Sequence, residues 1–168
     1  MITTKPDVYW LDGPWPGKLA ILARPRGGDW LSDEVAGWKE AGVDVVVSLL
    51  TRSEGSELDL INEHELVQRN GLRFINYPIA DYSVPASKKD IRQLVSKLEA
   101  WLVRGKSVGI HCRQGIGRSS LVAACVLLTS GESPGTVFQH ITRARGRPVP
   151  DTSEQRDWVT AFAQDLQS

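Results

Sequence analysis

A cysteine, two glycines and an arginine lie close together in the segment HCRQGIGRS at residues 111–119. The five residues between Cys112 and Arg118 allow the backbone to wrap so that several N–H groups point at one centre. Gly115 and Gly117 permit the tight dihedral angles that this requires and keep Cβ atoms out of the concave side. Such a nest of amides fits a tetrahedral dianion, and Arg118 adds a planar, bidentate donor for two of its oxygens.

Cys112 lies at the bottom of this positive field, which favours a nucleophilic thiolate at neutral pH. An apolar helix is expected to begin directly after the loop, so its positive dipole end adds to the field. Ser119 can donate a hydrogen bond to the sulfur and ease its later departure. The alternative, that Cys112 is only a small buried hydrophobe at a strand end, leaves the glycines and Arg118 unexplained.

A thiolate that attacks a phosphate ester needs an acid to protonate the leaving oxygen. Asp81, in the segment PIADYSVP, is the candidate because it follows an expected strand and precedes an expected helix. It should therefore lie at the same edge of the sheet as Cys112. An aspartate in such a segment can also simply form a turn, and its position alone does not decide between the two roles.

Apolar runs and turn residues predict the elements that hold these side chains. Strands are expected at 8–11, 19–23, 43–50, 72–79 and 107–111, and helices at 32–41, 56–70, 87–104, 119–129, 133–145 and 152–166. Strands that alternate with helices predict an α/β fold with a central, mainly parallel, twisted sheet of about five strands flanked by helices. Ligands bind such sheets at the carboxyl ends of the strands, where residues 112–118 are expected.

The chain has 168 residues and equal numbers of basic and acidic side chains, 20 Lys+Arg and 20 Asp+Glu. This length suits one domain, which we place at 1–168. Zero net charge argues against a nonspecific nucleic-acid binder. The two cysteines cannot form a disulfide framework or a Cys-rich zinc site. We expect no metal and no cofactor, because Arg118, the loop amides and the helix end would supply the positive charge that phosphoryl transfer needs. Without a signal-peptide pattern or an apolar run of about 20 residues, the expectation is a cytoplasmic monomer with no membrane span.

These motifs closely resemble the cysteine-based protein tyrosine phosphatase superfamily, in particular its small dual-specificity-like members. Three segments carry the resemblance: the loop from Cys112 to Ser119, the acid loop PIADYSVP, and RPVPDTSEQ at 147–155. The last resembles a region in which related phosphatases have Gln-Thr-x-x-Gln and position the hydrolytic water. The resemblance covers about residues 43 to 166, and it implies a phosphatase-like fold.

The resemblance implies roles for individual residues. Cys112 would be the nucleophile, and Asp81 would be the general acid in the first step and the general base in the second. Ser119 would assist breakdown of the cysteinyl-phosphate, and His111 would orient the loop or merely pack at the strand end. Arg118 would bind the phosphoryl group together with the loop residues Arg113, Gln114, Gly115, Ile116 and Gly117.

The chain departs from the family pattern at one place, because Asp151 stands where the first Gln of Gln-Thr-x-x-Gln is expected. The second, Gln155, is present and would contribute to substrate or water binding. Gln155 also fits a structural role as the partner of Thr152 in a capping box. Without the first Gln, the intermediate is expected to hydrolyse by a different route or to transfer more readily to other acceptors.

Other side chains have a structural and a functional interpretation. Cys125, within the apolar helix, is expected to pack in the core, and the alternative is a protective disulfide with Cys112. Arg143, Arg145 and Arg147 form a solvated helix end or guide an anionic substrate, and Arg52 and Arg113 would join that rim.

The predicted function is hydrolysis of phosphotyrosine, and also phosphoserine or phosphothreonine, in a protein or peptide substrate. The alternative enzyme is a phosphatase of a phosphoinositide, inositol phosphate or nucleotide. Only Arg113 adds a cation to the variable loop positions, whereas phosphatases with such substrates often carry lysine there. A noncatalytic phosphate-binding module and a sulfur-transfer enzyme are further alternatives. The first would not need Cys112, Arg118 and Asp81 together, and the second would not need Asp81.

Overall fold

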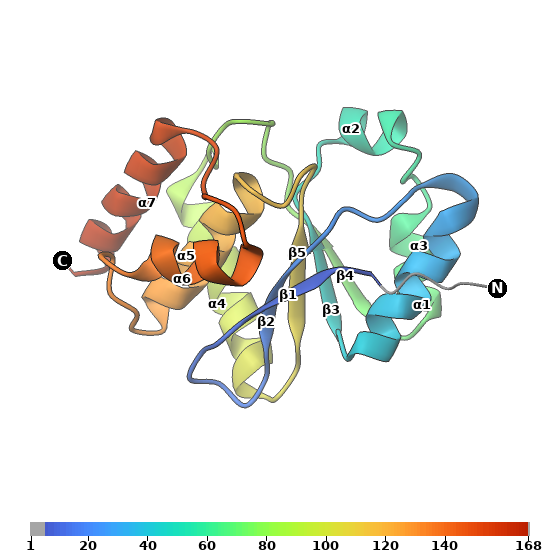
Figure 1. The fold of residues 1–168 in the computed structure, drawn as a ribbon, viewed down its shortest axis with the longest axis horizontal. Coiled ribbons are helices and arrows are strands. Elements are labelled where there is room, and N and C mark those ends of the chain that lie inside the picture. The colour runs from blue at the N-terminus through green and yellow to red at the C-terminus, as the bar shows by residue number, and fades with distance from the viewer. Residues whose placement is uncertain (1–5, 168) are drawn as a thin grey trace.

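A five-stranded sheet forms the centre of the computed structural model, which describes residues 6–167 (Figure 1). The strands lie in the order β1-β2-β5-β3-β4; β1 is antiparallel to β2 and all other neighbours are parallel. The predicted α/β class with a mainly parallel sheet is therefore confirmed. The strands are β1 (Val8–Leu11), β2 (Leu19–Leu22), β3 (Val45–Ser48), β4 (Arg73–Asn76) and β5 (Val108–His111).

Helices cover both faces of the sheet (Figure 1). On one face lie α4, α5 and α6, with α7 packed against α5, and on the other lie α1 and α3, so two apolar clusters form with the sheet between them. The helices are α1 (Leu31–Ala41), α2 (Arg52–Glu57), α3 (Glu63–Arg69), α4 (Lys88–Val103), α5 (Arg118–Thr129), α6 (Val137–Arg145) and α7 (Ser153–Leu166).

Strand β3 shows how the sheet divides the core. Its side chains alternate between the two faces, so Val45 and Val47 join the α5 side while Val46 joins the α1 side. All three are buried, as expected for a strand inside a parallel sheet. The central position of β5, between β2 and β3, places the 112–118 loop near the middle of one sheet edge.

The helix expected at 56–70 is wrong, because the chain forms α2 and α3 with a turn between them. Asp59 in this turn has a left-handed φ of 59°, and its carbonyl accepts a hydrogen bond from the Gly28 amide at 3.0 Å. A capping box at the start of α2 is formed by Thr51 and Glu54. A contact with a distant segment therefore interrupts an otherwise helical apolar spacing.

Two other helix starts differ from the prediction. A short 3₁₀ turn (Gly28–Trp30) precedes α1, so Ser32 lies inside the helix and does not cap it. Helix α6 begins at Val137, and residues 133–136 form a turn before it. The capping role considered for Thr152 of α7 is confirmed, since its side chain accepts a hydrogen bond from the backbone N–H three residues later, and Ser87 caps α4 in the same way.

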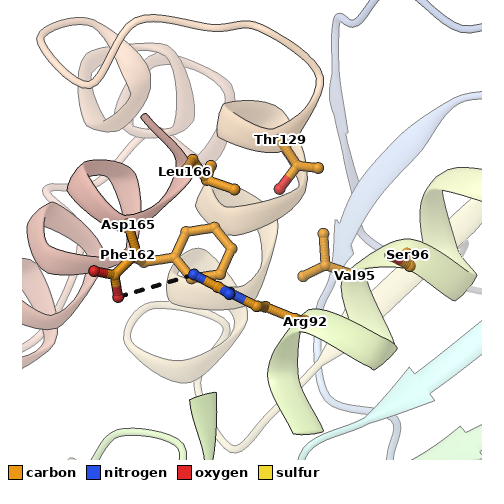
Figure 2. A pocket seen from close by; sticks show the side chains of 7 residues that line it. All are labelled: Arg92, Val95, Ser96, Thr129, Phe162, Asp165 and Leu166. Carbon is orange, nitrogen blue, oxygen red and sulfur yellow. Dashed lines mark ion pairs between the residues drawn. The ribbon is translucent and has the colours of Figure 1, made fainter. Parts of the chain in front are cut away.

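A hollow of about 250 Å³ lies between α4 and α7, on the α5 side of the sheet (Figure 2). Arg92 extends across it toward the carboxylate of Asp165 at 4.0 Å, beside the ring of Phe162. None of the residues that line it belongs to the 112–118 loop. Within residues 6–167, no helix is long and apolar enough to cross a membrane.

Candidate active site

The 112–118 loop leaves β5 and turns back over its own sulfur. Cys112 is 2% exposed, and its Sγ accepts a hydrogen bond from the Gly115 amide at 3.2 Å. Gly115 adopts a positive φ of 69°, which an L side chain rarely tolerates. The sequence therefore folds this loop so that a backbone N–H stabilises the cysteine sulfur.

Helix α5 begins at the end of this loop. Gly117 is its N-cap, and the first turn contains no acidic side chain. The unpaired amides and the positive end of the helix dipole therefore face the loop without a local counter-charge from the helix itself. This is the anion-attracting arrangement that the sequence predicts.

Arg118 is fully buried and held by Glu54, Ile79, Asp81 and, more weakly, the Leu49 carbonyl at 3.5 Å. Its Nη1 and Nη2 donate to the two carboxylate oxygens of Glu54 at 2.7 and 2.9 Å, and Nη1 also donates to the Ile79 carbonyl at 2.7 Å. Nη2 lies 3.0 Å from Oδ1 of Asp81. Burial alone would lower the pKa of Arg118, but the hydrogen bonds with Glu54 raise it, so the guanidinium stays charged.

Glu54 is a site residue that sequence reasoning missed. It is buried in the first turn of α2, where it completes a capping box with Thr51. Burial would raise its pKa, but hydrogen bonds from Arg118 and Thr51 outweigh burial and lower the pKa to about 2. The Thr-x-x-Glu spacing directly after β3 was the available signal, because a capping box at a strand end fixes a carboxylate near the loops of that edge.

Asp81 lies on an irregular segment between β4 and α4. Its Oδ1 accepts the amide of Tyr82 at 3.0 Å, and Tyr82 has a left-handed φ of 62°. The Asp81 side chain keeps 33% of its surface exposed. The segment thus points a carboxylate at Arg118 while leaving it open to solvent, and the Tyr82 ring beside it is also exposed.

Gln155 is fully buried beside the loop. Its Oε1 accepts the amides of Asp151 and Thr152 at 3.1 and 3.2 Å, and its Nε2 donates to the carbonyl of Ser83 at 3.0 Å. The amide thus caps α7 and ties it to the acid-bearing segment. These contacts favour the capping-box interpretation of Gln155 over direct water binding.

Ser119 and His111 differ from their expected contacts. The predicted hydrogen bond from Ser119 to Cys112 is not formed; its buried hydroxyl has no partner among residues 6–167, so it is free to turn toward a ligand or the sulfur. His111 is buried, pairs with Glu63 at 2.5 Å and stacks on Trp38. Since Trp38 belongs to the α1-side cluster, His111 anchors the end of β5 rather than facing the sulfur.

Other residues of the 112–118 loop are held by contacts with neighbouring helices. Arg113 pairs with Glu57 at 3.1 Å and lies 3.7 Å from Glu54, so its charge is already matched. Ile116 is buried in the core. The carbonyls of Gln114 and Gly115 each accept a hydrogen bond from Arg145 at 3.0 Å.

This use of Arg145 was not foreseen, because the sequence placed it on a solvated helix end or a substrate rim. Its guanidinium lies 4.2 Å from the ring centroid of Tyr9, on β1. The side chain therefore links the last turn of α6, the first strand and the outer surface of the 112–118 loop.

The second cysteine, Cys125, is fully buried in α5 and joins the α5-side core. Burial raises the pKa of its thiol, which disfavours the thiolate that disulfide exchange requires. Both cysteines are free in the structure, so the core interpretation of Cys125 is favoured over a protective disulfide.

The structure thus gathers Cys112, Arg118, Asp81, Asp151 and Gln155 around one loop, and adds Glu54 to them. Their segments follow β3, β4 and β5 or lie at the start of α7, which brings distant parts of the sequence to one edge of the sheet. Among the residues that the structure describes, no group of three His, Cys, Asp or Glu side chains is arranged to hold a metal ion. The reactive groups that the structure does bring together are a cysteine sulfur, a guanidinium and carboxylates.

Comparisons with known proteins agree with this arrangement. The family model described as "Polymorphic toxin system, DSP-PTPase phosphatase" matches residues 22–132. Cyclin-dependent kinase inhibitor 3 of Rattus norvegicus and of Homo sapiens are each 31% identical to the chain over 133 residues, 76% of this chain and 61% of theirs. The chain thus spans about six-tenths of the length of these relatives.

Solved structures share the fold. A structure of kinase associated phosphatase with its catalytic-site cysteine changed to serine gives a TM-score of 0.89 at 24% identity, covering 99% of both chains. The structure of PTPMT1 in complex with PI(5)P gives 0.71 at 17% identity, covering 88% of this chain and 92% of that one. The predicted phosphatase-like fold is confirmed. With two thirds of its length matched by the family model, the chain belongs to the small dual-specificity phosphatases of the cysteine-based protein tyrosine phosphatase superfamily.

Proposed function

We propose that residues 1–168 form one catalytic domain that hydrolyses phosphotyrosine, and also phosphoserine or phosphothreonine, in proteins. The observation that carries this proposal is the placement of Arg118 between a fixed carboxylate, Glu54, and an accessible one, Asp81, beside the sulfur of Cys112. A phosphoryl group bound here would meet a nucleophile (Cys112), a cation (Arg118) and a proton donor (Asp81).

The first step follows from this geometry. The Cys112 thiolate attacks phosphorus, and the bond from phosphorus to the ester oxygen breaks. Asp81 donates its proton to that oxygen, so the leaving group departs as a neutral alcohol or phenol. Arg118 and the loop amides stabilise the charge on the phosphoryl oxygens, which is the main task of catalysis in phosphoryl transfer.

The second step is hydrolysis of the cysteinyl-phosphate. Water attacks phosphorus opposite the sulfur, and Cys112 leaves as a thiolate that the Gly115 amide is placed to stabilise. The buried Ser119 hydroxyl can donate a second hydrogen bond to the departing sulfur once it rotates. Positive charge comes from Arg118 and the start of α5, so the proposed mechanism uses no metal or cofactor.

Two features support a phosphoprotein over a polyphosphorylated small molecule as substrate. Arg113 is the one additional cation within the loop sequence, and Glu57 and Glu54 already neutralise it. Tyr82 places an exposed aromatic ring next to Asp81, where it can pack against a phosphotyrosine ring. The fold similarity to PTPMT1 in complex with PI(5)P keeps a phosphoinositide as the second candidate.

The basic test measures hydrolysis of p-nitrophenyl phosphate. Wild-type protein should turn over this substrate with vanadate inhibition and without loss in chelator, and Cys112→Ser should abolish turnover. A Cys112→Ser variant with near-normal rate would overturn the assignment.

Substrate class requires a panel of phosphopeptides, phosphoinositides, inositol phosphates and nucleotides. A kcat/KM highest for phosphotyrosine peptides is expected, and a preference for a phosphoinositide would favour the second candidate. Pull-down with Cys112→Ser or Asp81→Ala then identifies the trapped substrate. Such a domain also suits a reducing compartment such as the cytoplasm, since Cys112 must stay unoxidised, and a monomer is expected.

A further inference from the structure

Charged side chains of alternating sign form a row that leads from the surface of α2 to the acid-bearing segment. The members of this charged row are, in order, Glu57, Arg113, Glu54, Arg118 and Asp81. Successive members approach each other to 3.1, 3.7, 2.7 and 3.0 Å between a nitrogen and an oxygen atom. The proposed mechanism uses Arg118 and Asp81, and Glu54 fixes Arg118, which leaves the outer pair of Glu57 and Arg113 without a role in the reaction.

The outer pair joins the end of α2 to the residue that directly follows the nucleophile. Glu57 is the last residue of α2, and Arg113 comes directly after Cys112. Nη2 and Nη1 of Arg113 donate to the two carboxylate oxygens of Glu57 at 3.1 and 3.5 Å, and Nη1 also lies 3.7 Å from Oε2 of Glu54. Both terminal nitrogens of this guanidinium therefore already have a carboxylate partner.

The stability of the fold does not explain why Glu57 is acidic. Its side chain is 61% exposed, and ion pairs at such positions contribute little to the free energy of unfolding. A carboxylate in the last turn of a helix also opposes the helix dipole, and the capping box of α2 is formed by Thr51 and Glu54. What Glu57 does change is the charge that the protein presents beside Cys112.

The net charge of the charged row limits what can bind beside the scissile phosphate. When Asp81 carries the proton that the first step requires, the two arginines balance the two glutamates and the row is neutral. Arg118 is directed to the scissile phosphoryl group, so no positive charge remains for a second anion. Without Glu57 the same row would carry one net positive charge, and terminal nitrogens of Arg113 would be open to a ligand. The charge of Asp81 also acts on Arg113, which places this cation at the same mouth as the acid.

We infer that Glu57 is a specificity-determining residue that disfavours substrates with a second anionic group next to the scissile phosphate. The inference rests on the proposed function and narrows its substrate class to phosphorylated residues that lack acidic neighbours. Glu57 acts in two ways: it occupies the donors of Arg113 that a second anion would need, and its own charge repels that anion. Acidic phosphopeptides, phosphoinositide bisphosphates and nucleoside diphosphates share the disfavoured chemistry.

The test uses two phosphotyrosine peptides that differ only in the residues on either side of the phosphotyrosine, alanine in one and aspartate in the other. The readout is the ratio of kcat/KM for the aspartate peptide to that for the alanine peptide, which should be below one for the wild type. Glu57→Gln should raise this ratio by about threefold to tenfold at low ionic strength, because one unit charge is removed a few ångströms from the ligand. High salt should reduce the gain, because it screens that charge.

The matched control is Glu65→Gln. It removes a carboxylate of similar exposure, 59%, that pairs with Arg69 on α3 and not with the 112–118 loop. Glu65→Gln should keep the wild-type ratio, since the net charge of the whole protein changes as in Glu57→Gln but the charged row does not.

The double variant of Glu57→Gln and Arg113→Gln tests whether the gain depends on Arg113. With both members of the outer pair uncharged, the charged row is neutral again, so the ratio should return toward the wild-type value. The inference would be overturned by an unchanged ratio in Glu57→Gln, by a gain that persists in the double variant, or by an equal gain in Glu65→Gln. A wild-type protein that hydrolyses neither peptide would instead refute the proposed function, so the two failures are distinguishable.

Discussion

Arg118 contacts two carboxylates that have the same chemistry and opposite surroundings. Glu54 lies on the inner side, buried, with both oxygens bonded to the guanidinium and one also bonded to Thr51. Asp81 lies on the outer side, one-third exposed, with Oδ1 near Nη2 and a hydrogen bond from the neighbouring Tyr82 amide.

The contrast shows how one arginine serves both structure and chemistry. A buried, fully bonded carboxylate fixes the direction of the guanidinium and keeps its charge. An exposed carboxylate with few partners can exchange protons with solvent and substrate. The inner side of Arg118 therefore contributes to the fold, and the outer side is the one that the proposed mechanism uses.

Glu54→Gln tests the inner side and should have the largest effect. Removing one partner of a buried ion pair leaves the other charge uncompensated, which costs about 3–5 kcal/mol of the free energy of unfolding. Urea denaturation of the variant and the wild type measures this difference. Glu57→Gln, which removes the exposed partner of Arg113, is the matched control and should change stability little.

If Glu54→Gln and Glu57→Gln lowered the free energy of unfolding equally, burial of the Glu54–Arg118 pair would not be the source of the effect.

Acid unfolding tests the same ion pair through its pKa. Because the pKa of Glu54 is lowered from 4.5 to about 2, the folded protein binds the Glu54 proton more weakly than the unfolded chain does. Its contribution to stability is therefore complete above pH 4.5 and disappears as pH falls toward about 2. Stability curves between these values should fall more steeply for wild type than for Glu54→Gln, and parallel curves would contradict the assignment.

The sequence predicted the residues on the outer side of Arg118 better than Glu54 on its inner side. Cys112, Arg118 and Asp81 lie in compact motifs, and the apolar runs before them become β5 and the region of β4. These motifs and the order of the strands were enough to predict that the three residues lie together, because the carboxyl ends of parallel strands meet at one edge of the sheet.

Glu54 and the break before α3 escaped prediction because distant contacts determine them. Ile61 has the spacing of an apolar helix face, yet it is 72% exposed. The Gly28 amide reaches the Asp59 carbonyl from a segment about thirty positions earlier and stabilises a turn there. Local apolar periodicity contains no information about that contact. It also predicted a helix that begins at residue 56, after the capping box at Thr51.

Asp81→Asn tests the outer side and should leave the fold intact. Loss of a general acid should lower kcat by about 10²-fold for an alkyl or phenyl phosphate, whose leaving group needs a proton. The loss should be much smaller for an activated aryl phosphate. The measurement is kcat across phosphate esters of increasing leaving-group acidity, together with thermal unfolding. A uniform loss for all esters, or marked destabilisation, would place Asp81 with Glu54 as a structural residue.

Arg145→Met extends the contrast to the outer surface of the loop, where an arginine bonds carbonyls instead of carboxylates. Losing its two hydrogen bonds to Gln114 and Gly115 should cost about 1–3 kcal/mol, because those carbonyls help direct the loop amides inward. We expect kcat/KM for p-nitrophenyl phosphate to fall roughly tenfold, with vanadate binding weakened in proportion. Arg145→Lys keeps the charge but not the planar fork, so it should recover little. Full recovery by lysine would mean that Arg145 acts by charge on the substrate, as a rim residue, and not by holding the loop.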